Sequence, residues 1–169
     1  MIKCVLFLAV LALILPMLAF ANRSVHLKSG DVAPGFTADS TIGKISLSQF
    51  KGRYVILYFY PKDMSPGCSM QANEFRTLYN ELIKQKVEVI GVSKDNLELH
   101  DEFAKKYDIP YPLISDIEGK ISNSYGARRG ITRSTFLIGS DQKIINIIHK
   151  INPKGHATAL LEILKSIKE

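Results

Sequence analysis

One cysteine stands where a thiol could do redox chemistry. Cys68 follows a segment rich in proline and glycine, residues 61–67, and precedes a stretch with helical periodicity. It therefore falls in the first turn of a helix, where unpaired backbone N–H groups and the helix dipole favour a thiolate over a thiol. Because the thiolate is the nucleophilic form, this position predicts a reactive cysteine. The alternative is an inert thiol buried in the core, a common place for free cysteine.

The segment before Cys68 offers further groups. Ser65, three residues upstream, supplies a hydroxyl that could bond a small ligand at the sulfur. Pro61 and Pro66 restrict the backbone on either side of it and predict a rigid approach to the thiol. Simpler interpretations remain open, since Ser65 fits an ordinary helix cap and Pro61 fits the end of a strand.

The elements that position Cys68 can be predicted from the sequence pattern. Residues 54–60 form a continuous β-branched and aromatic run, which is typical of a strand buried on both faces. After the loop, apolar side chains recur at helical spacing from Phe75 onward and predict a helix over about residues 66–85. The cysteine thus lies at a junction between a buried strand and a helix.

The rest of the chain alternates strands and helices. We expect a short strand or turn at 44–50, strands at 87–93, 134–138 and 144–149, an extended segment at 110–113, and helices at 97–107 (capped by Asp95 or Asn96), 116–125 (capped by Asp116) and 155–168. The βαβα order favours parallel pairing in the first half, and the short link at 139–143 favours an antiparallel hairpin. The predicted fold class is α/β, a thioredoxin-like fold with a mixed central sheet and helices on both faces.

The N-terminal residues are typical of a secretory signal peptide. Lys3 is positively charged, residues 4–15 form an apolar run, Pro16 interrupts it, and residues 19–21 place small side chains at a cleavage site. The 46% hydrophobic content of the chain is raised by this leader. We therefore expect an exported protein, periplasmic or secreted.

Cleavage would leave a single domain of ordinary size. The expected division is a signal peptide at residues 1–21 and one thioredoxin-like domain at residues 22–169. The alternative is a membrane anchor, since residues 4–21 are about long enough to span a bilayer. Cys4 belongs to the leader, so Cys68 would be the one thiol of the exported domain. A lone thiol in an oxidising compartment suggests that it is used.

Residues 58–72, YFYPKDMSPGCSMQA, are similar to the active-site segment of peroxiredoxins, and most of all to their bacterioferritin-comigratory, or peroxiredoxin Q, subgroup. The family pattern P-x-x-x-[T/S]-x-x-C is met by Pro61, Ser65 and Cys68. Three further segments resemble the family in the same order: residues 30–36, 89–93 and 133–138. The resemblance covers most of the domain and implies an antioxidant thiol peroxidase.

The resemblance assigns roles to four residues. It implies that the Cys68 thiolate attacks hydrogen peroxide or an organic hydroperoxide and becomes a sulfenic acid. It further implies that Arg133 stabilises the thiolate and polarises the peroxide, that Ser65 and nearby N–H groups hold the peroxide oxygens, and that Pro61 shields the sulfenic acid. From position alone, Arg133 fits a surface residue or an ion pair equally well. We expect no cofactor and no metal.

Two departures from the subgroup pattern bear on the reaction. Ser65 stands where many members have threonine, which keeps the hydroxyl. Asn73 stands where many members carry a resolving cysteine, five residues after the peroxidatic one. An exported chain without Cys4 could form no internal disulfide. The resemblance therefore implies a one-Cys enzyme that an external thiol or a thioredoxin-like protein reduces, with a sulfenic acid open to overoxidation.

The composition excludes several other classes of partner. The net charge of +6 is spread along the chain and interleaved with acidic residues, and the only dense arginine group is Arg128, Arg129 and Arg133. We expect no nucleic acid partner, no stable membrane insertion after cleavage, and a monomer. The four histidines show no metal-ligand spacing, and each is expected at the surface or in a strand: His26, His100, His149 and His156.

Two rival functions stay open. A thioredoxin-like thiol–disulfide oxidoreductase usually carries C-x-x-C, whereas Gln71 occupies the second position here. A redox sensor or binding module that uses oxidised Cys68 to signal or to join a partner would have the same sequence. Turnover separates a sensor from an enzyme, because a sensor reacts once and stays oxidised until its partner arrives.

Overall fold

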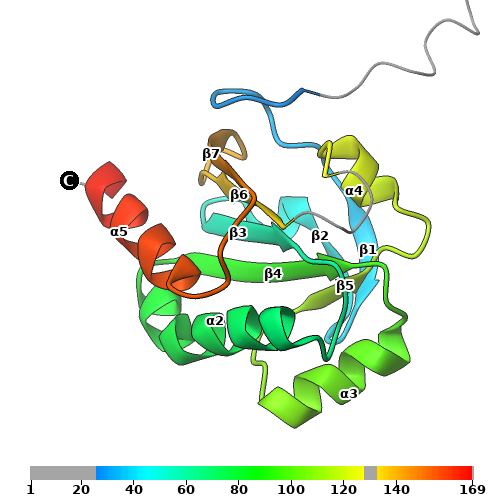
Figure 1. Cartoon of the computed structure of the whole chain (residues 1–169). Helices are drawn as coiled ribbons and strands as arrows, with labels where there is room; N and C mark the ends of the chain where they lie inside the picture. Colours follow the sequence, from blue (N-terminus) through cyan, green and yellow to red (C-terminus); the bar gives the residue numbers. More distant parts are fainter. Residues whose placement is uncertain (1–25, 128–132, 169) are drawn as a thin grey trace, which may run out of the picture.

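A computed structural model of the chain describes residues 26–127 and 133–168. These residues fold around one seven-stranded sheet with helices against it (Figure 1). The expected signal peptide, residues 1–21, and the pair Arg128 and Arg129 lie outside the described residues. Within the described part of the chain, no helix has the length and apolar character that crossing a membrane requires.

The sheet is mixed, as the sequence predicts. Its strands are β1 (Thr37–Ser40), β2 (Gly43–Ser46), β3 (Tyr54–Phe59), β4 (Val87–Ser93), β5 (Leu113–Ser115), β6 (Ser134–Ile138) and β7 (Ile144–His149). They lie side by side in the order β2-β1-β5-β4-β3-β6-β7. Strands β3, β4 and β5 are parallel, and β6 and β7 add the predicted antiparallel hairpin beside β3. The central position of β3 and β4 follows from their apolar residues on both faces.

Helices cover both faces of the sheet, although unequally. The helices are α2 (Pro66–Lys84), α3 (Leu97–Tyr107), α4 (Lys120–Ser124) and α5 (His156–Lys168), with a 3-10 helix η1 at Leu47–Phe50. One core layer joins the sheet to α2, α3 and α5 through side chains such as Phe75, Phe103 and Leu160. The other contains Leu47 of η1 and Ile121 of α4. Figure 1 shows α4 on the far side of the sheet from α2 and α3.

The structure differs from the sequence prediction at the weakly patterned segments. Strand β1 was not predicted, because its sequence TADS has no apolar alternation; it pairs with β2 at the edge of the sheet. The single element expected at 44–50 is divided between β2 and η1. Helix α4 is shorter than the predicted 116–125, although Asp116 does accept bonds from the amides of Ile121 and Ser122. The carboxylate therefore caps a helix that begins four residues beyond it.

Candidate active site

Cys68 lies in the first turn of α2, as its sequence position predicts. Ser65 is the N-cap residue, Pro66 begins the helix, and the first intrahelical bond joins the amide of Ser69 to the Ser65 carbonyl at 2.9 Å. The amides of Gly67 and Cys68 therefore have no acceptor within the helix. The cysteine is buried, with 2% of its surface exposed. It is the only cysteine among the residues that the structure describes.

Arg133 contacts the cysteine directly. Its Nη2 donates a hydrogen bond to Cys68 Sγ at 3.1 Å, across 65 residues of sequence. Antiparallel pairing explains how the two meet: Ser134, the first residue of β6, pairs with Phe59, the last residue of β3, so Arg133 lies beside the end of β3 from which the loop to Cys68 departs. A guanidinium at this distance stabilises negative charge on the sulfur. Of its own nitrogens, Nε is buried without a partner in the described structure.

A glycine makes room for this contact. A side-chain Cβ at Gly67 would lie 2.7 Å from Arg133 Nη2 and 3.5 Å from Cγ of Pro153. The first distance is below van der Waals contact, so any larger residue at this position would displace the guanidinium. The link that holds Pro153, between β7 and α5, thus also reaches the site. Gly67 and Pro153 were not predicted as site residues.

The structure places Ser65 and Pro61 in the loop that leads to Cys68. The Ser65 hydroxyl donates to the carbonyl of Lys62 at 3.0 Å and makes no capping bond to the helix. Its oxygen lone pairs are thereby left to accept a bond from a ligand. Pro61 lies two residues beyond the end of β3 and is half-buried. No hydrogen bond is recorded between either residue and the cysteine.

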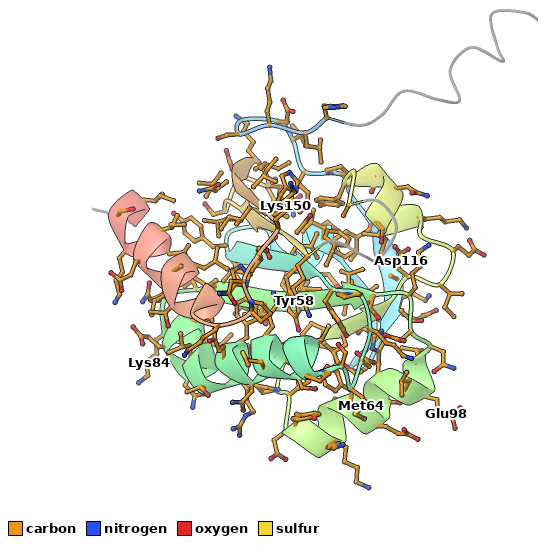
Figure 2. All side chains as sticks on the ribbon, viewed as in Figure 1. Tyr58, Met64, Lys84, Glu98, Asp116 and Lys150 are labelled. Carbon is orange, nitrogen blue, oxygen red and sulfur yellow. The ribbon has the colours of Figure 1, made fainter. Side chains whose placement is uncertain are left out.

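A buried polar cluster under this loop was not predicted. Asp63 is 1% exposed and its carboxylate lies 2.6 Å from Nδ1 of His100, a fully buried residue of α3. The expectation that His100 lies at the surface or in a strand is therefore wrong. A signal was present in the sequence, since His100 falls three residues from both Leu97 and Phe103 on the apolar face of the predicted helix. Figure 2 labels Met64, the next residue of this loop, close to α3.

A second buried histidine joins α2 to α5. His156 is 5% exposed, which also contradicts the prediction, and its Nδ1 lies 3.0 Å from Nε2 of Gln71. Burial lowers the pKa of His156 to about 4, against a smaller opposite effect of Glu74, so the ring is neutral near pH 7. Glu74 accepts bonds from the amides of Gly155 and Ala157 and thereby caps α5. Gln71 and Glu74 follow Cys68 on α2, so this contact fixes the helix that carries the cysteine.

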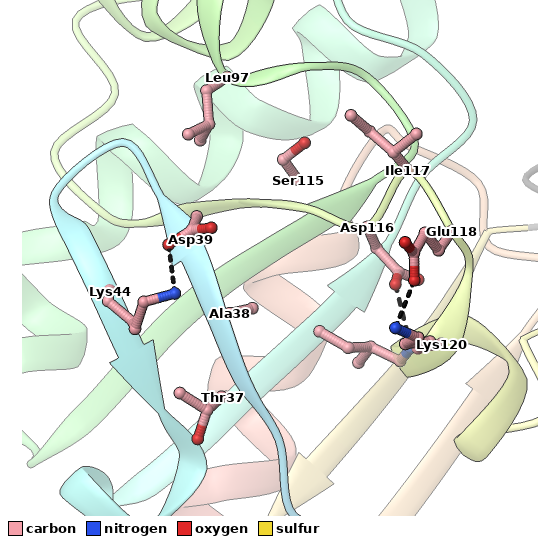
Figure 3. Close-up of a pocket in the computed structure, with 11 residues that line it drawn as sticks. Thr37, Ala38, Asp39, Lys44, Leu97, Ser115, Asp116, Ile117, Glu118 and Lys120 are labelled. Carbon is pink, nitrogen blue, oxygen red and sulfur yellow. Dashed lines mark hydrogen bonds and ion pairs between the residues drawn. The ribbon is translucent and has the colours of Figure 1, made fainter.

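Other polar groups and hollows of the described chain lie away from Cys68. Within the described residues, no group of histidine, cysteine, aspartate and glutamate side chains is arranged to hold a metal ion. His149 is exposed at the end of β7, where Nδ1 lies 3.0 Å from the Ser134 hydroxyl. Near β1 and α4, a hollow of about 440 Å³ contains none of the predicted site residues (Figure 3). Its charged rim is paired internally, as Asp39 with Lys44 and Glu118 with Lys120.

Comparison with known proteins identifies the family of this chain. The AhpC/TSA family model matches residues 29–147. A putative peroxiredoxin bcp of Coxiella burnetii is 37% identical over 148 residues, 81% of this chain and 98% of that protein. The peroxiredoxin Bcp of Bacillus subtilis is 34% identical over 154 residues, 85% of this chain and 98% of that protein.

Solved structures extend the likeness to the fold. A cysteine-to-serine mutant of PrxQ from Xylella fastidiosa superposes with a TM-score of 0.82 at 30% identity, covering 86% of this chain and 99% of that one. The thioredoxin-like fold inferred from the sequence is thereby confirmed, as is the resemblance to the peroxiredoxin Q subgroup. The chain belongs to the AhpC/TSA family and is a thiol-dependent peroxidase of the peroxiredoxin class.

Proposed function

We propose that the chain reduces hydrogen peroxide and organic hydroperoxides by a one-Cys cycle centred on Cys68. The thiolate attacks the terminal peroxide oxygen, the O–O bond breaks, and water or an alcohol leaves after taking up a proton. Cys68 then carries one added oxygen as a sulfenic acid. An external thiol attacks this sulfur, releases water and forms a mixed disulfide, which a second thiol reduces. The observation that carries the proposal is the 3.1 Å contact from Arg133 Nη2 to Cys68 Sγ.

The proposed roles of the other residues follow from their places around the sulfur. Arg133 holds the thiolate and aims positive charge at the oxygen on which charge develops. Ser65 accepts a hydrogen bond from the peroxide while its own hydroxyl continues to donate to the Lys62 carbonyl. The amides of Gly67 and Cys68 point out of the helix start toward the same region. Pro61 narrows the approach and shields the sulfenic acid.

The one-Cys form of the cycle rests on the absence of a second thiol near the first. Asn73, one and a half turns along α2 from Cys68, accepts two bonds from Arg76 and offers no sulfur. The only other cysteine of the sequence, Cys4, belongs to the leader that we propose is removed on export. The reductant is then an external thiol or a thioredoxin-like protein. A processed N-terminus at residue 22 on the exported protein would support this division, and size-exclusion chromatography would test the proposed monomer.

The deciding experiment measures the mass of the intact chain, residues 22–169, after a brief pulse of stoichiometric hydrogen peroxide. We expect a gain of one oxygen on Cys68, reversed by an added thiol, and steady peroxide consumption when that thiol is in excess. Cys68→Ser, the matched control, should show neither. Oxidation without turnover would favour a redox sensor instead, and reduction of insulin disulfides would favour a thiol–disulfide oxidoreductase. No modification within seconds would refute the peroxidase cycle.

A further inference from the structure

The loop between β3 and α2 contains a buried carboxylate that the peroxidase cycle does not use. Asp63 lies five residues before Cys68 and is 1% exposed. A buried charge is costly unless partners offset the loss of water. The partners of Asp63 therefore show what it does in the fold.

Both carboxylate oxygens and the backbone N–H of Asp63 are engaged. The Tyr60 hydroxyl donates to Oδ1 at 2.7 Å, and His100 Nδ1 lies 2.6 Å from Oδ2. Burial and the neighbouring carboxylate raise the pKa of Tyr60 well above its usual value, so its hydroxyl keeps the proton that it donates. The backbone N–H of Asp63 donates to Oδ2 of Asp95 at 2.8 Å, and Asp95 also accepts from the Ser93 hydroxyl at 2.7 Å. Asp63 is therefore bonded to the residue that follows β3, to α3 and to the turn after β4.

Both ring nitrogens of His100 contact oxygen atoms. Nδ1 faces the Asp63 carboxyl group, and Nε2 lies 3.1 Å from the backbone carbonyl of Ile114 in β5. Hydrogen on both ring nitrogens would satisfy an ionised Asp63 and the Ile114 carbonyl together, which is the arrangement tested below. The Tyr60 hydroxyl oxygen, 3.4 Å from Nδ1, is a second and longer contact on the same side. Asp63 and His100 thus form a buried pair joined to the loop on one side of the ring and to the sheet on the other.

We propose that the Asp63–His100 ion pair is the positioning device of the peroxidatic loop, which holds Ser65 and Cys68 where peroxide reacts. The proposal rests on the peroxidase function of Cys68. Asp63 and His100 touch neither the sulfur nor the substrate; they act by fixing the backbone between β3 and α2. Met64 follows Asp63 and has a φ of +59°. This left-handed backbone conformation is uncommon for residues other than glycine and requires support from its surroundings. The ion pair supplies that constraint on one side, and Pro66 at the start of α2 supplies it on the other.

The anchor reaches rigid parts of the molecule. His100 sits in α3, whose N-terminus is capped by Asn96 through its bond to the Leu99 amide. The same ring bonds to Ile114 in β5, so a single side chain links the loop to a helix and to the sheet. Loss of the link releases the loop without removing any atom from the reacting site. Since a displacement of about 1 Å can cost about 100-fold in rate, the effect on peroxide reduction is large.

The experiment compares two reactions of the same thiol. The variants are His100→Gln, Asp63→Asn and the double variant, with Leu164→Ala as a control that removes buried apolar volume on α5 instead. One reaction is single-turnover oxidation of Cys68 by hydrogen peroxide, which needs the loop. The other is alkylation of Cys68 by iodoacetamide, which needs only an accessible thiolate. Both are followed by quenching and intact mass, and stability is measured by urea unfolding.

The positioning role predicts a selective loss. We expect each single variant to oxidise at about one tenth to one hundredth of the wild-type rate, with alkylation changed by less than about threefold. The double variant should lose no more than the worse single variant, because the two residues act as one unit. Leu164→Ala should lower stability and leave both rates within about twofold. In the wild-type chain, nitrogen NMR at pH 7 should show both His100 ring nitrogens protonated.

Three results would overturn the proposal. The first is a folded His100→Gln that oxidises within about twofold of wild type. The second is an equal loss of both reactions, in proportion to the loss of stability. The third is a neutral His100 ring. If His100→Gln does not fold, Asp63→Asn decides, since it keeps the shape of the side chain and removes its charge; an unchanged oxidation rate there refutes the proposal. Slow oxidation of the wild-type chain would instead refute the peroxidase function itself.

Discussion

At the scale of single residues, the central feature of the proposed site is the contact between the Arg133 guanidinium and the Cys68 sulfur. Arg133 donates to Cys68 from the residue just before β6, so the charge is positioned by the sheet and comes from outside α2. Cys68 in turn lies where the helix start favours negative charge on the sulfur. The two effects have separate origins in the chain and can be separated by substitution.

Replacing the arginine tests the geometry of the charge. Arg133→Lys keeps the positive charge but loses the planar fork of donors, and Arg133→Gln loses the charge as well. We expect the second-order rate of Cys68 oxidation to fall about 10-fold in the lysine variant and about 100-fold or more in the glutamine variant. Stopped reactions followed by intact mass measure both rates. Equal rates in the two variants would show that charge is unimportant at this position.

Adding one methyl group tests the space that the arginine needs. In Gly67→Ala the new Cβ would lie 2.7 Å from Arg133 Nη2, so the guanidinium has to move off the sulfur. We expect oxidation of Cys68 to slow by about 10-fold while the fold is kept. Gly35→Ala is the matched control, because nothing lies within 4 Å of its Cβ position. A Gly67→Ala enzyme as fast as the control would contradict the proposed role of the contact.

At the scale of elements, α2 is fixed at its first turn by Arg133 and further along by α5. The Gln71–His156 contact and the Glu74 cap form the second attachment. His156 is neutral there, and its buried ring cannot take up a proton without losing stability. This attachment makes the stability of the fold depend on pH in a direction that can be derived.

The pH dependence follows from the lowered pKa of His156. Above about pH 6.5 the ring is neutral in both the folded and unfolded chain, and its full contribution is present. Between about 6.5 and 4 the unfolded chain binds a proton that the folded chain does not, so stability falls by up to about 1.4 kcal/mol per pH unit. The free energies of unfolding of wild type and His156→Gln, measured in urea, should have different pH dependence over this interval, because only the wild type loses this contribution. Parallel curves would mean that the ring is not protected from protons.

The accuracy of the sequence predictions differs between elements for physical reasons. Strands β3, β4, β6 and β7 and helices α2, α3 and α5 have long apolar patterns, and their predicted limits match to within a residue or two. Strand β1 and helix α4 are short and polar, so pairing and capping across the fold define them instead of local pattern. Local sequence therefore predicted the elements that build the core, but it missed β1 and placed the start of α4 too early.

The residues of the site also differ in how far the local sequence predicts them. Cys68 and Ser65 follow from local sequence, because one helix start places both of them. Arg133 was expected only from the family resemblance, since nothing in its own neighbourhood marks it. The pairing of Asp63 with His100 joins residues 37 positions apart, and a buried aspartate in a polar loop looks like any turn residue. Contacts between residues that are far apart in the sequence cannot be predicted from the local sequence pattern.

At the scale of the whole molecule, a single sheet brings distant segments to one place. The parallel strands β3 and β4 carry the loops to α2 and α3, and the antiparallel β6 brings in Arg133. Cys68, Arg133 and the Asp63–His100 pair all lie around the end of β3 where the chain leaves the sheet. The proposed site at this end of the strands thus draws on β3, β4, β6, α2 and α3, which explains why most of the described chain is needed to build so small a site.

The burial of Cys68 has a consequence for how the proposed cycle would be completed. With 2% of the residue exposed, the sulfur offers almost no surface to the face of another protein. In the proposed cycle, we therefore expect regeneration by a protein thiol to wait for the start of α2 to open. The rate of reduction should rise with the concentration of a thioredoxin-like donor and then level off at the opening rate, whereas a small thiol should show a later plateau or none. A strictly linear dependence on the protein donor, measured by rapid mixing, would mean that the oxidised sulfur is already open to its partner.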